Sequence, residues 1–282
     1  MAFNFSDKLI DSENGATLIV DALNLAFRWK HQGRTDFCSD YIRVVQSLAR
    51  SYDCGRIIIT TDGGSSTYRK EIDPEYKQNR KDKYSQQSQA EKDAFEQFFL
   101  EFERTLEQLE EDYTVLKYSG VEADDIAAHL VKHKEKYGLD KIWLISSDRD
   151  WDLLITKDVS RFSYVTRKEV THDTWKDHYD VTQDEYISMK CLTGDKGDNV
   201  PGIPGIGPKR ATDLIRGYGS AMDIYDALPI DSKYKFIQEL NSSDDRLLVN
   251  YQLMDLITYC DEAIGPENLA DIERRLLSEA EL

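Results

Sequence analysis

The sequence lacks an apolar run that approaches the ~20 residues needed for a helix to cross a bilayer. Its first ten residues, MAFNFSDKLI, also lack a basic segment followed by an apolar stretch and a cleavage site. We therefore expect an intracellular, soluble protein that makes no contact with membranes. An extended heptad repeat is missing too, so we expect a monomer. With 282 residues, the chain can form one large α/β domain or a domain with a smaller appendage.

Cysteine and histidine, the usual zinc ligands, are few. The four cysteines form no CxxC pair, so they indicate neither a zinc site nor a disulfide framework and are expected to be reduced thiols: Cys38, Cys54, Cys191 and Cys260. His129 and His133 lie four residues apart in HLVKH on a predicted helix, a spacing that can hold zinc. This segment lacks the glutamate of the metalloprotease signature, so we expect an exposed, uninvolved histidine pair.

Positive charge is in deficit, because 36 Lys and Arg face 53 Asp and Glu, giving a net charge of −17. This balance alone argues against a polyanionic partner. The charges are unevenly distributed, however, since residues 219–282 hold 14 acids and 5 Lys or Arg. Residues 66–92 hold seven Lys or Arg against five acids, and RWKHQGR at 28–34 is also basic. An acidic protein with such basic strips can still bind nucleic acid.

Three short apolar runs predict buried strands: TLIV at 17–20, RIIIT at 56–60 and KIWLIS at 141–146. Nearly continuous apolar runs are typical of strands that are covered on both faces of a parallel sheet. Between them, apolar residues recur at helical spacing over 41–49 and 95–109. This alternation predicts an α/β fold with a mostly parallel central sheet flanked by helices.

An aspartate follows each predicted strand. Asp21 ends IVD, Asp62 ends IIITTD, and the third strand runs into DRDWD with Asp148, Asp150 and Asp152. In open parallel sheets, ligands bind outside the carboxyl ends of the strands. A lone acid there, such as Asp21 or Asp152, is more simply a helix N-cap. Three strands that deliver carboxylates to one edge form a like-charge cluster, which is costly unless a metal ion neutralises it.

Two more acidic motifs extend this pattern. In GVEADDIAAHL, Glu122, Asp124 and Asp125 open a predicted helix, whose dipole stabilises a first-turn acid by roughly 0.3–1 kcal/mol and so explains one or two of them. A hard divalent cation with oxygen ligands would account for all three. In GDKGDN, Asp195 and Asp198 are either turn formers or further ligands. Many carboxylates without histidine favour Mg²⁺ or Mn²⁺ over Zn²⁺.

Two segments suit a polyanionic ligand. Residues 66–92 fit a solvated surface loop or, because they begin just after Asp62, a basic flap over the acidic edge. Further on, GIPGIGPKR joins two predicted helices and ends in Lys209 and Arg210. Its glycines fit a tight αα-hairpin with glycine caps or a sequence-independent grip on nucleic-acid phosphate.

Six motifs occur in this order: IVDALN, ITTDGG, PEYKQNR, VEADD, SSDRDWD and GDKGDNVPGIPGIGPKR. Together they resemble the 5′-nuclease superfamily, most closely the flap endonucleases and 5′-exonucleases of T-odd coliphages and related phages. The resemblance implies a PIN-like metal-dependent nuclease core over 1–185, with a helical arch at about 66–112. It also implies a helix-hairpin, or helix-three-turn-helix, module for duplex DNA and C-terminal packing helices over 186–282.

All nine acids of the phage pattern are present. By resemblance, a first divalent ion is surrounded by Asp21, Asp62, Glu122 and Asp124, and a second by Asp148, Asp150, Asp195 and Asp198, with Asp125 close to both. The implied chemistry is two-metal hydrolysis with Mg²⁺, for which Mn²⁺ can substitute, and it requires no side-chain nucleophile. The resemblance places Asp148 and Asp150 among the catalytic groups, together with Lys77 and Arg80.

The resemblance also implies DNA contacts. Lys77 would reach the scissile phosphate, Arg80 would steer the single-stranded 5′ end at the arch, and Tyr76 would stack on a base. The hairpin at 202–207 would grip duplex DNA and is able to hold K⁺ through backbone carbonyls. Its DNA contacts would be Gly202, Gly205, Gly207, Lys209 and Arg210.

The implied function is a structure-specific 5′-nuclease, acting as flap endonuclease and 5′-3′ exonuclease on DNA flaps and overhangs in replication or repair. RNA-primed 5′ ends are further candidate substrates. The cellular setting would be the cytoplasm of a bacterial or phage-infected bacterial cell, with a replication polymerase acting in trans because no polymerase domain is attached. Two alternatives stay open. A PIN-type ribonuclease shares the carboxylates but needs neither the basic stretch nor the glycine hairpin, and a catalytically weak DNA-junction-binding protein would keep the grip alone.

Overall fold

The computed structural model describes residues 15–278. The first ten residues, for which no leader is expected, lie in the segment 1–14, outside the described residues. A six-stranded sheet forms the centre, in the spatial order β3-β2-β1-β4-β5-β6. Its strands are β1 (Ala16–Asp21), β2 (Cys54–Thr60), β3 (Thr114–Leu116), β4 (Ile142–Ile145), β5 (Val159–Ser163) and β6 (Lys168–Val170). All neighbouring strands run parallel except β5 and β6. The three predicted strands are confirmed as β1, β2 and β4, and the predicted α/β class is correct.

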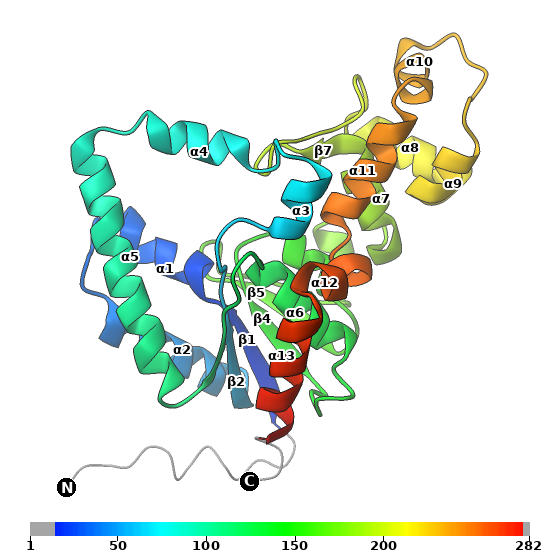
Figure 1. The fold of residues 1–282 in the computed structure, drawn as a ribbon. Coiled ribbons are helices and arrows are strands. Elements are labelled where there is room, and N and C mark those ends of the chain that lie inside the picture. The colour runs from blue at the N-terminus through cyan, green and yellow to red at the C-terminus, as the bar shows by residue number, and fades with distance from the viewer. Residues whose placement is uncertain (1–14, 279–282) are drawn as a thin grey trace, which may run out of the picture.

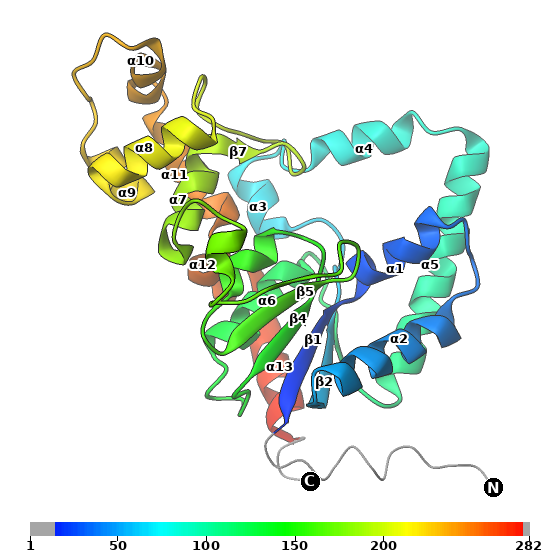
Figure 2. The same ribbon diagram turned by 180° about the vertical axis from the view of Figure 1, so that it is seen from behind.

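Helices cover both faces of the sheet, as the continuous apolar strands require. Leu18 and Val20 of β1 point into a core shared with α1 (Ala22–His31), α2 (Cys38–Ser51) and the second half of α5 (Gln89–Glu110). Ile19 points to the other face, toward α6 (Ala123–Lys132), α12 (Leu256–Ile264) and α13 (Pro266–Ser278). Figures 1 and 2 show these two layers on either side of the strands.

The helices after β6 form a second group with a core of its own. They are α7 (Gln183–Thr193), α8 (Pro208–Tyr218), α9 (Ala221–Asp226), α10 (Lys235–Asn241) and α11 (Asp244–Met254). A two-stranded hairpin, β7 (Gly194–Asp195) and β8 (Val200–Pro201), joins α7 to α8. Leu192, Leu214, Leu240 and Leu247 are buried at the centre of this group. The last two helices, α12 and α13, return to cover the sheet, so the C-terminal region serves both parts of the molecule.

The chain between β2 and β3 forms the predicted helical arch. It consists of α3 (Thr67–Ile72), α4 (Gln78–Ser85) and the first half of α5. In Figure 1, α4 stands away from the sheet and links the region of β7 to the beginning of α5. Every residue of α4 has some solvent exposure, which explains why its sequence has no apolar periodicity. Ser88 and Glu91 form a capping box that starts α5.

Two further features concern the described residues. None of the helices there is long and apolar enough to span a membrane. All four cysteines are buried and free.

Candidate active site and nucleic-acid interface

Acids from three parallel strands meet at one edge of the sheet. Asp21 ends β1, Asp62 follows β2, and Asp148 follows β4. Asp21 accepts a hydrogen bond from the Asn24 amide (3.2 Å), so it caps α1 as well. Its second oxygen accepts from the Ser146 hydroxyl at 2.7 Å. Burial, followed by the nearby Asp62 and Asp148 carboxylates, raises the pKa of Asp21 to about 8.

Asp62 and Asp124 are held by neutral donors. The Ala123 amide, in the first turn of α6, donates to Asp62 at 2.8 Å. The Trp151 indole donates to Asp124 at 2.6 Å. Burial raises the pKa of both carboxyls, and the charge of Asp148 adds to the rise at Asp124. Four acids form no direct ion pair within residues 15–278: Asp21, Asp62, Asp124 and Asp148. Much of the mutual repulsion between these carboxylates is therefore uncompensated.

Glu122 and Asp125 differ, because the buried Arg69 and the partly buried Lys77 neutralise them. Arg69 of α3 donates to both oxygens of Asp125, at 2.7 and 2.8 Å, and also lies 3.3 Å from Glu122. Lys77 Nζ lies 2.8 Å from the other Glu122 oxygen. Burial alone would raise the pKa of Glu122, but Lys77 and Arg69 outweigh it and the pKa falls below its usual value.

Arg69 therefore changes the interpretation of Asp125. The resemblance implied a carboxylate close to both metal ions, whereas here both oxygens accept from one guanidinium and the side chain is fully buried. Arg69 Nε also donates to the Leu253 carbonyl at 2.8 Å, at the end of α11. Asp125 thus fixes α6 against α3 and α11 and positions its neighbours.

A second buried cation, Lys190, pairs with Asp150 and Asp195. Lys190 of α7 is buried, with Nζ 2.6 Å from Asp150 and 3.1 Å from Asp195. Burial raises the pKa of Asp150 to about 6, although Lys190 opposes the rise. At Asp195, Lys190 and the amides of the β7–β8 turn outweigh burial and lower the pKa. Asp198 accepts from Arg80 at 2.5 Å and lies 3.5 Å from Lys77.

Asp152, the third acid after β4, is not part of the cluster. Its oxygens accept from Arg161 Nε (2.5 Å) and Nη2 (2.9 Å), and the Tyr179 hydroxyl donates to it as well. This buried pair joins η2 (Asp150–Leu154) to β5, and a structural role accounts for it.

The start of the arch lies directly over the acids. Lys77 has a left-handed backbone (φ 54°) and caps α4, one turn before Arg80. Both side chains contact acids, as described above, so the structure brings the predicted phosphate-binding residues and the predicted metal ligands together. The expected base-stacking role of Tyr76 does not fit its position. The residue is 3% exposed, and its hydroxyl lies 3.0 Å from a Glu122 oxygen and 2.9 Å from an Asp198 oxygen, so the ring has no free face for a base.

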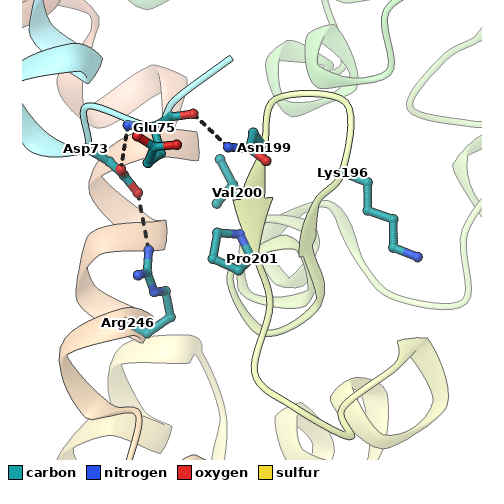
Figure 3. A pocket seen from close by; sticks show the side chains of 7 residues that line it. All are labelled: Asp73, Glu75, Lys196, Asn199, Val200, Pro201 and Arg246. Atoms are coloured by element: carbon teal, nitrogen blue, oxygen red, sulfur yellow. Dashed lines mark hydrogen bonds and ion pairs between the residues drawn. The ribbon is translucent and has the colours of Figure 1, made fainter. Parts of the chain in front are cut away.

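The arch is fastened to the β7–β8 hairpin and to α11. Figure 3 shows a hollow at this junction, where Arg246 of α11 lies 3.3 Å from Asp73. Asn199 donates to the Glu75 carbonyl at 2.8 Å, and Asn79 donates to the Lys196 carbonyl at 3.0 Å. Hydrogen bonds therefore tie the turn that presents Asp195 and Asp198 to the base of the arch.

The glycine loop at 202–207 precedes α8 as predicted. Gly202 has no room for a side chain, since a Cβ would lie 2.2 Å from the Thr193 carbonyl oxygen, and Gly205 has a φ of +79°. Gly207 is the N-cap of α8. Arg210 donates to the Gly205 carbonyl at 2.6 Å and lies over the Phe236 ring, while Lys209 is exposed. Both cations are exposed, and Arg210 also stabilises the loop itself.

Two residues of this site, Arg69 and Lys190, were not predicted from the sequence. Arg69 lies within the basic stretch 66–92, and Lys190 belongs to none of the six motifs. A weak signal existed for each. Arg69 lies between Asp62 and Lys77, and Lys190 precedes Asp195 by five positions on a helix that leads into the glycine-rich turn. Neither signal reveals a buried ion pair, because the partners are far apart in the sequence. Arg69 and Asp125 are separated by 56 residues, and Lys190 and Asp150 by 40.

Comparisons with known proteins agree with this arrangement. The family description "5′-3′ exonuclease, N-terminal resolvase-like domain" matches residues 16–183, and "5′-3′ exonuclease, C-terminal SAM fold" matches residues 181–275. The flap endonuclease of Escherichia phage T5 is 44% identical over 88% of this chain and 86% of its own length. A 5′-3′ exonuclease of Buchnera aphidicola is 27% identical over 75% of this chain and 73% of its own.

Solved structures are similar over nearly the whole chain. A complex of the bacteriophage T5 flap endonuclease with DNA and metal ions has a TM-score of 0.90 and 42% identity, covering 95% of this chain and 100% of that one. The T5 5′-exonuclease with bound zinc has a TM-score of 0.89 and 42% identity, covering 93% and 98%. The fold, the placement of the acids and these matches lead to one conclusion: the chain belongs to the 5′-3′ exonuclease family and is a nuclease of the flap-endonuclease type.

Proposed function

We propose that this nuclease hydrolyses DNA phosphodiesters near the junction of a 5′ flap and a duplex, using two divalent ions of the Mg²⁺ type. One observation carries the proposal. Asp21, Asp62, Asp124 and Asp148 gather at the sheet edge without a direct ion pair, and burial holds the pKa of the first three above its usual value. A divalent cation supplies the charge that these groups lack.

The donor set fits a hydrated Mg²⁺. All nine acids offer oxygen, which Mg²⁺ and Mn²⁺ prefer. All nine acids lie within the described residues. No three of them have carboxylate oxygens that lie within 4.8 Å of one another. This wide spacing suits an ion that retains several water ligands. The four acids without an ion pair would hold the first ion. Asp150, Asp195 and Asp198 would hold the second, once Lys190 and Arg80 turn aside. Bound there, the ions supply an activated water and stabilise charge on the phosphodiester.

The chain's own cations would position the substrate. The side chains of Lys77 and Arg80 extend from the arch to the acids. A phosphate that enters there would pair with these two cations in place of their carboxylate partners. Lys77 would then orient the scissile phosphate and Arg80 the strand that leads to it. Lys209 and the amides of the 202–207 loop would hold the duplex at a distance from the cut.

A potassium ion in the 202–207 loop belongs to the same proposal. The carbonyl of Gly205 already accepts from Arg210 at 2.6 Å. A bound K⁺ would therefore use the other carbonyls of the loop or displace this guanidinium.

The test is cleavage of a 5′-labelled flap duplex with Mg²⁺, with Ca²⁺ and with chelator, comparing the wild type with Asp148→Ala. We expect cutting near the junction that requires both Mg²⁺ and Asp148. An intact flap in Mg²⁺ with wild-type protein that binds the duplex normally would overturn the proposal, and it would leave a junction-binding role.

A further inference from the structure

The histidine pair of α6 lies beside an acid from a distant helix. His129 Nδ1 is 2.6 Å from Asp261 Oδ1 on α12, and His133 Nε2 is 3.3 Å from the same oxygen. The expectation of an exposed, uninvolved pair is therefore wrong. His129 is buried, with 5% of its surface exposed, and both rings face the same carboxylate. The two helices pack closely here, on the face of the sheet opposite α2 and α5 (Figure 1).

These three side chains have the spacing of a metal-binding set. One ligand atom from each lies within 4.8 Å of the other two, and the described residues contain no other such group of His, Cys, Asp or Glu. Histidines at i and i+4 present their rings on one helical face, which is the usual way a helix contributes two nitrogen ligands. Imidazole and carboxylate together suit zinc and other transition ions.

Neighbouring groups prepare the site. The second nitrogen of His129 contacts the Tyr137 hydroxyl at 2.9 Å, which holds the ring so that Nδ1 faces Asp261; outer partners of this kind orient metal-binding histidines. Lys132 lies 2.9 Å from Asp261 Oδ2, and His133 Nε2 is 3.2 Å from the same oxygen, so His133 contacts both carboxylate oxygens. The side chains of His133 and Asp261 are about one-third exposed, so an ion can enter from solvent. Cys260 Sγ lies 3.6 Å from the same Oδ1.

We propose that His129, His133 and Asp261 form a Zn²⁺-type transition-metal site, separate from the acids at the sheet edge. An ion there would join the C-terminal turn of α6 to α12. The N-terminal turn of α6 carries Glu122, Asp124 and Asp125, and Arg69 already ties that end to α11. The ion would therefore fasten the other end of the helix that presents the acids, and it would act on stability.

Zinc binding to the full chain tests the proposal. Equilibrium dialysis with Zn²⁺ in excess Mg²⁺ measures the bound zinc. His133→Gln should bind one equivalent of zinc fewer per chain than the wild type. The His133 side chain is about one-third exposed, so this change should leave the fold intact, and Asp261→Asn provides a second variant. The matched control is His172→Gln, an exposed histidine that contacts only Gln183 among the described residues, and it should retain the wild-type value.

A thermal readout separates this site from zinc bound at the catalytic acids. Zinc at about 100 times its Kd should raise the Tm of the wild type by about 5 °C, and His133→Gln should lose this increment. Cleavage of the flap substrate in Mg²⁺ should be the same for both proteins. Equal zinc stoichiometry in the wild type and His133→Gln would refute the site, whatever the total number of ions bound.

Discussion

Two sets of acids lie at the same edge of the sheet and differ in what neutralises them. Glu122, Asp125 and Asp195 each have a lysine or arginine at 2.7–3.1 Å. Asp21 and Asp124 accept from a serine, an amide and an indole, with no direct ion pair. The pKa is lowered at Glu122 and Asp195 and raised at Asp21 and Asp124. Asp150 is the exception, because burial raises its pKa to about 6 although Lys190 pairs with it. The ion-paired acids are thus neutralised within the fold, whereas Asp21 and Asp124 have no counter-ion among the described residues.

The division separates stability from activity. A buried carboxylate that lacks a counter-ion destabilises the folded state, while one that is paired destabilises it only when its partner is removed. Substitutions in the two sets should therefore have opposite effects on the free energy of unfolding. The predictions below test this contrast, beginning with the largest effect.

Asp124→Asn should reduce flap cleavage by about 10³-fold or more, because it removes a ligand from the set that needs the ion. The same change should leave the metal-free protein equally or more stable, by up to ~2 kcal/mol, since a repelled charge is lost. Single-turnover cleavage and chemical denaturation in chelator give the two values. Glu107→Gln, an exposed acid of α5, is the control. A destabilised Asp124→Asn protein would contradict the division.

Asp125→Asn should destabilise the protein by about 3 kcal/mol, because it leaves the buried Arg69 without its main partner. Urea denaturation measures this loss, and Asp36→Asn, an exposed acid, should change the value by less than ~0.5 kcal/mol. If Asp125 instead held a metal ion and little else, its substitution would abolish cleavage with no loss of metal-free stability.

The stability of the metal-free protein should fall as the pH rises from about 4 to 8. The pKa of Asp21 goes from its usual 3.8 to about 8 on folding, so the folded state binds a proton in this range that the unfolded chain has released. Mg²⁺ should accordingly raise the Tm more at pH 8 than at pH 6. In chelator, Asp21→Asn should reduce the change in the free energy of unfolding across this pH range by ~1–2 kcal/mol. An unchanged slope in this variant would show that Asp21 ionises normally.

Lys209→Ala should weaken duplex binding only a few-fold, equally for all sequences, and reduce the salt slope of log Kd by about one. Lys209 is exposed beside the glycine loop, and losing one phosphate contact has this signature. Fluorescence anisotropy over a range of salt concentrations measures both. Lys157→Ala, at the opposite edge of the sheet, should leave the slope unchanged.

The sequence predicts the parts of this molecule that depend on short-range pattern. Continuous apolar runs identify β1, β2 and β4, and the aspartates that follow them identify the edge where acids gather. The strands β3 and β6 have three residues each, too few to show a pattern, and they were missed. Neutralisation of the acids depends on long-range pairing, and no spacing rule connects Arg69 with Asp125 or Lys190 with Asp150. For the same reason the burial of Tyr76 and the approach of Asp261 to the histidine pair were not predicted.

The contacts of Lys77 and Arg80 with Glu122 and Asp198 have a thermodynamic consequence. When a DNA phosphate pairs with these cations, Glu122 and Asp198 lose their counter-ions. DNA should therefore increase the affinity of the protein for divalent ions. Linkage is reciprocal, and the ions must increase the affinity for DNA by the same factor. Titrating DNA with and without Ca²⁺, and Ca²⁺ with and without DNA, should give two equal ratios. Under the proposed function, Lys77 and Arg80 would thus be temporary counter-ions, and substrate and metal would each prepare the place of the other.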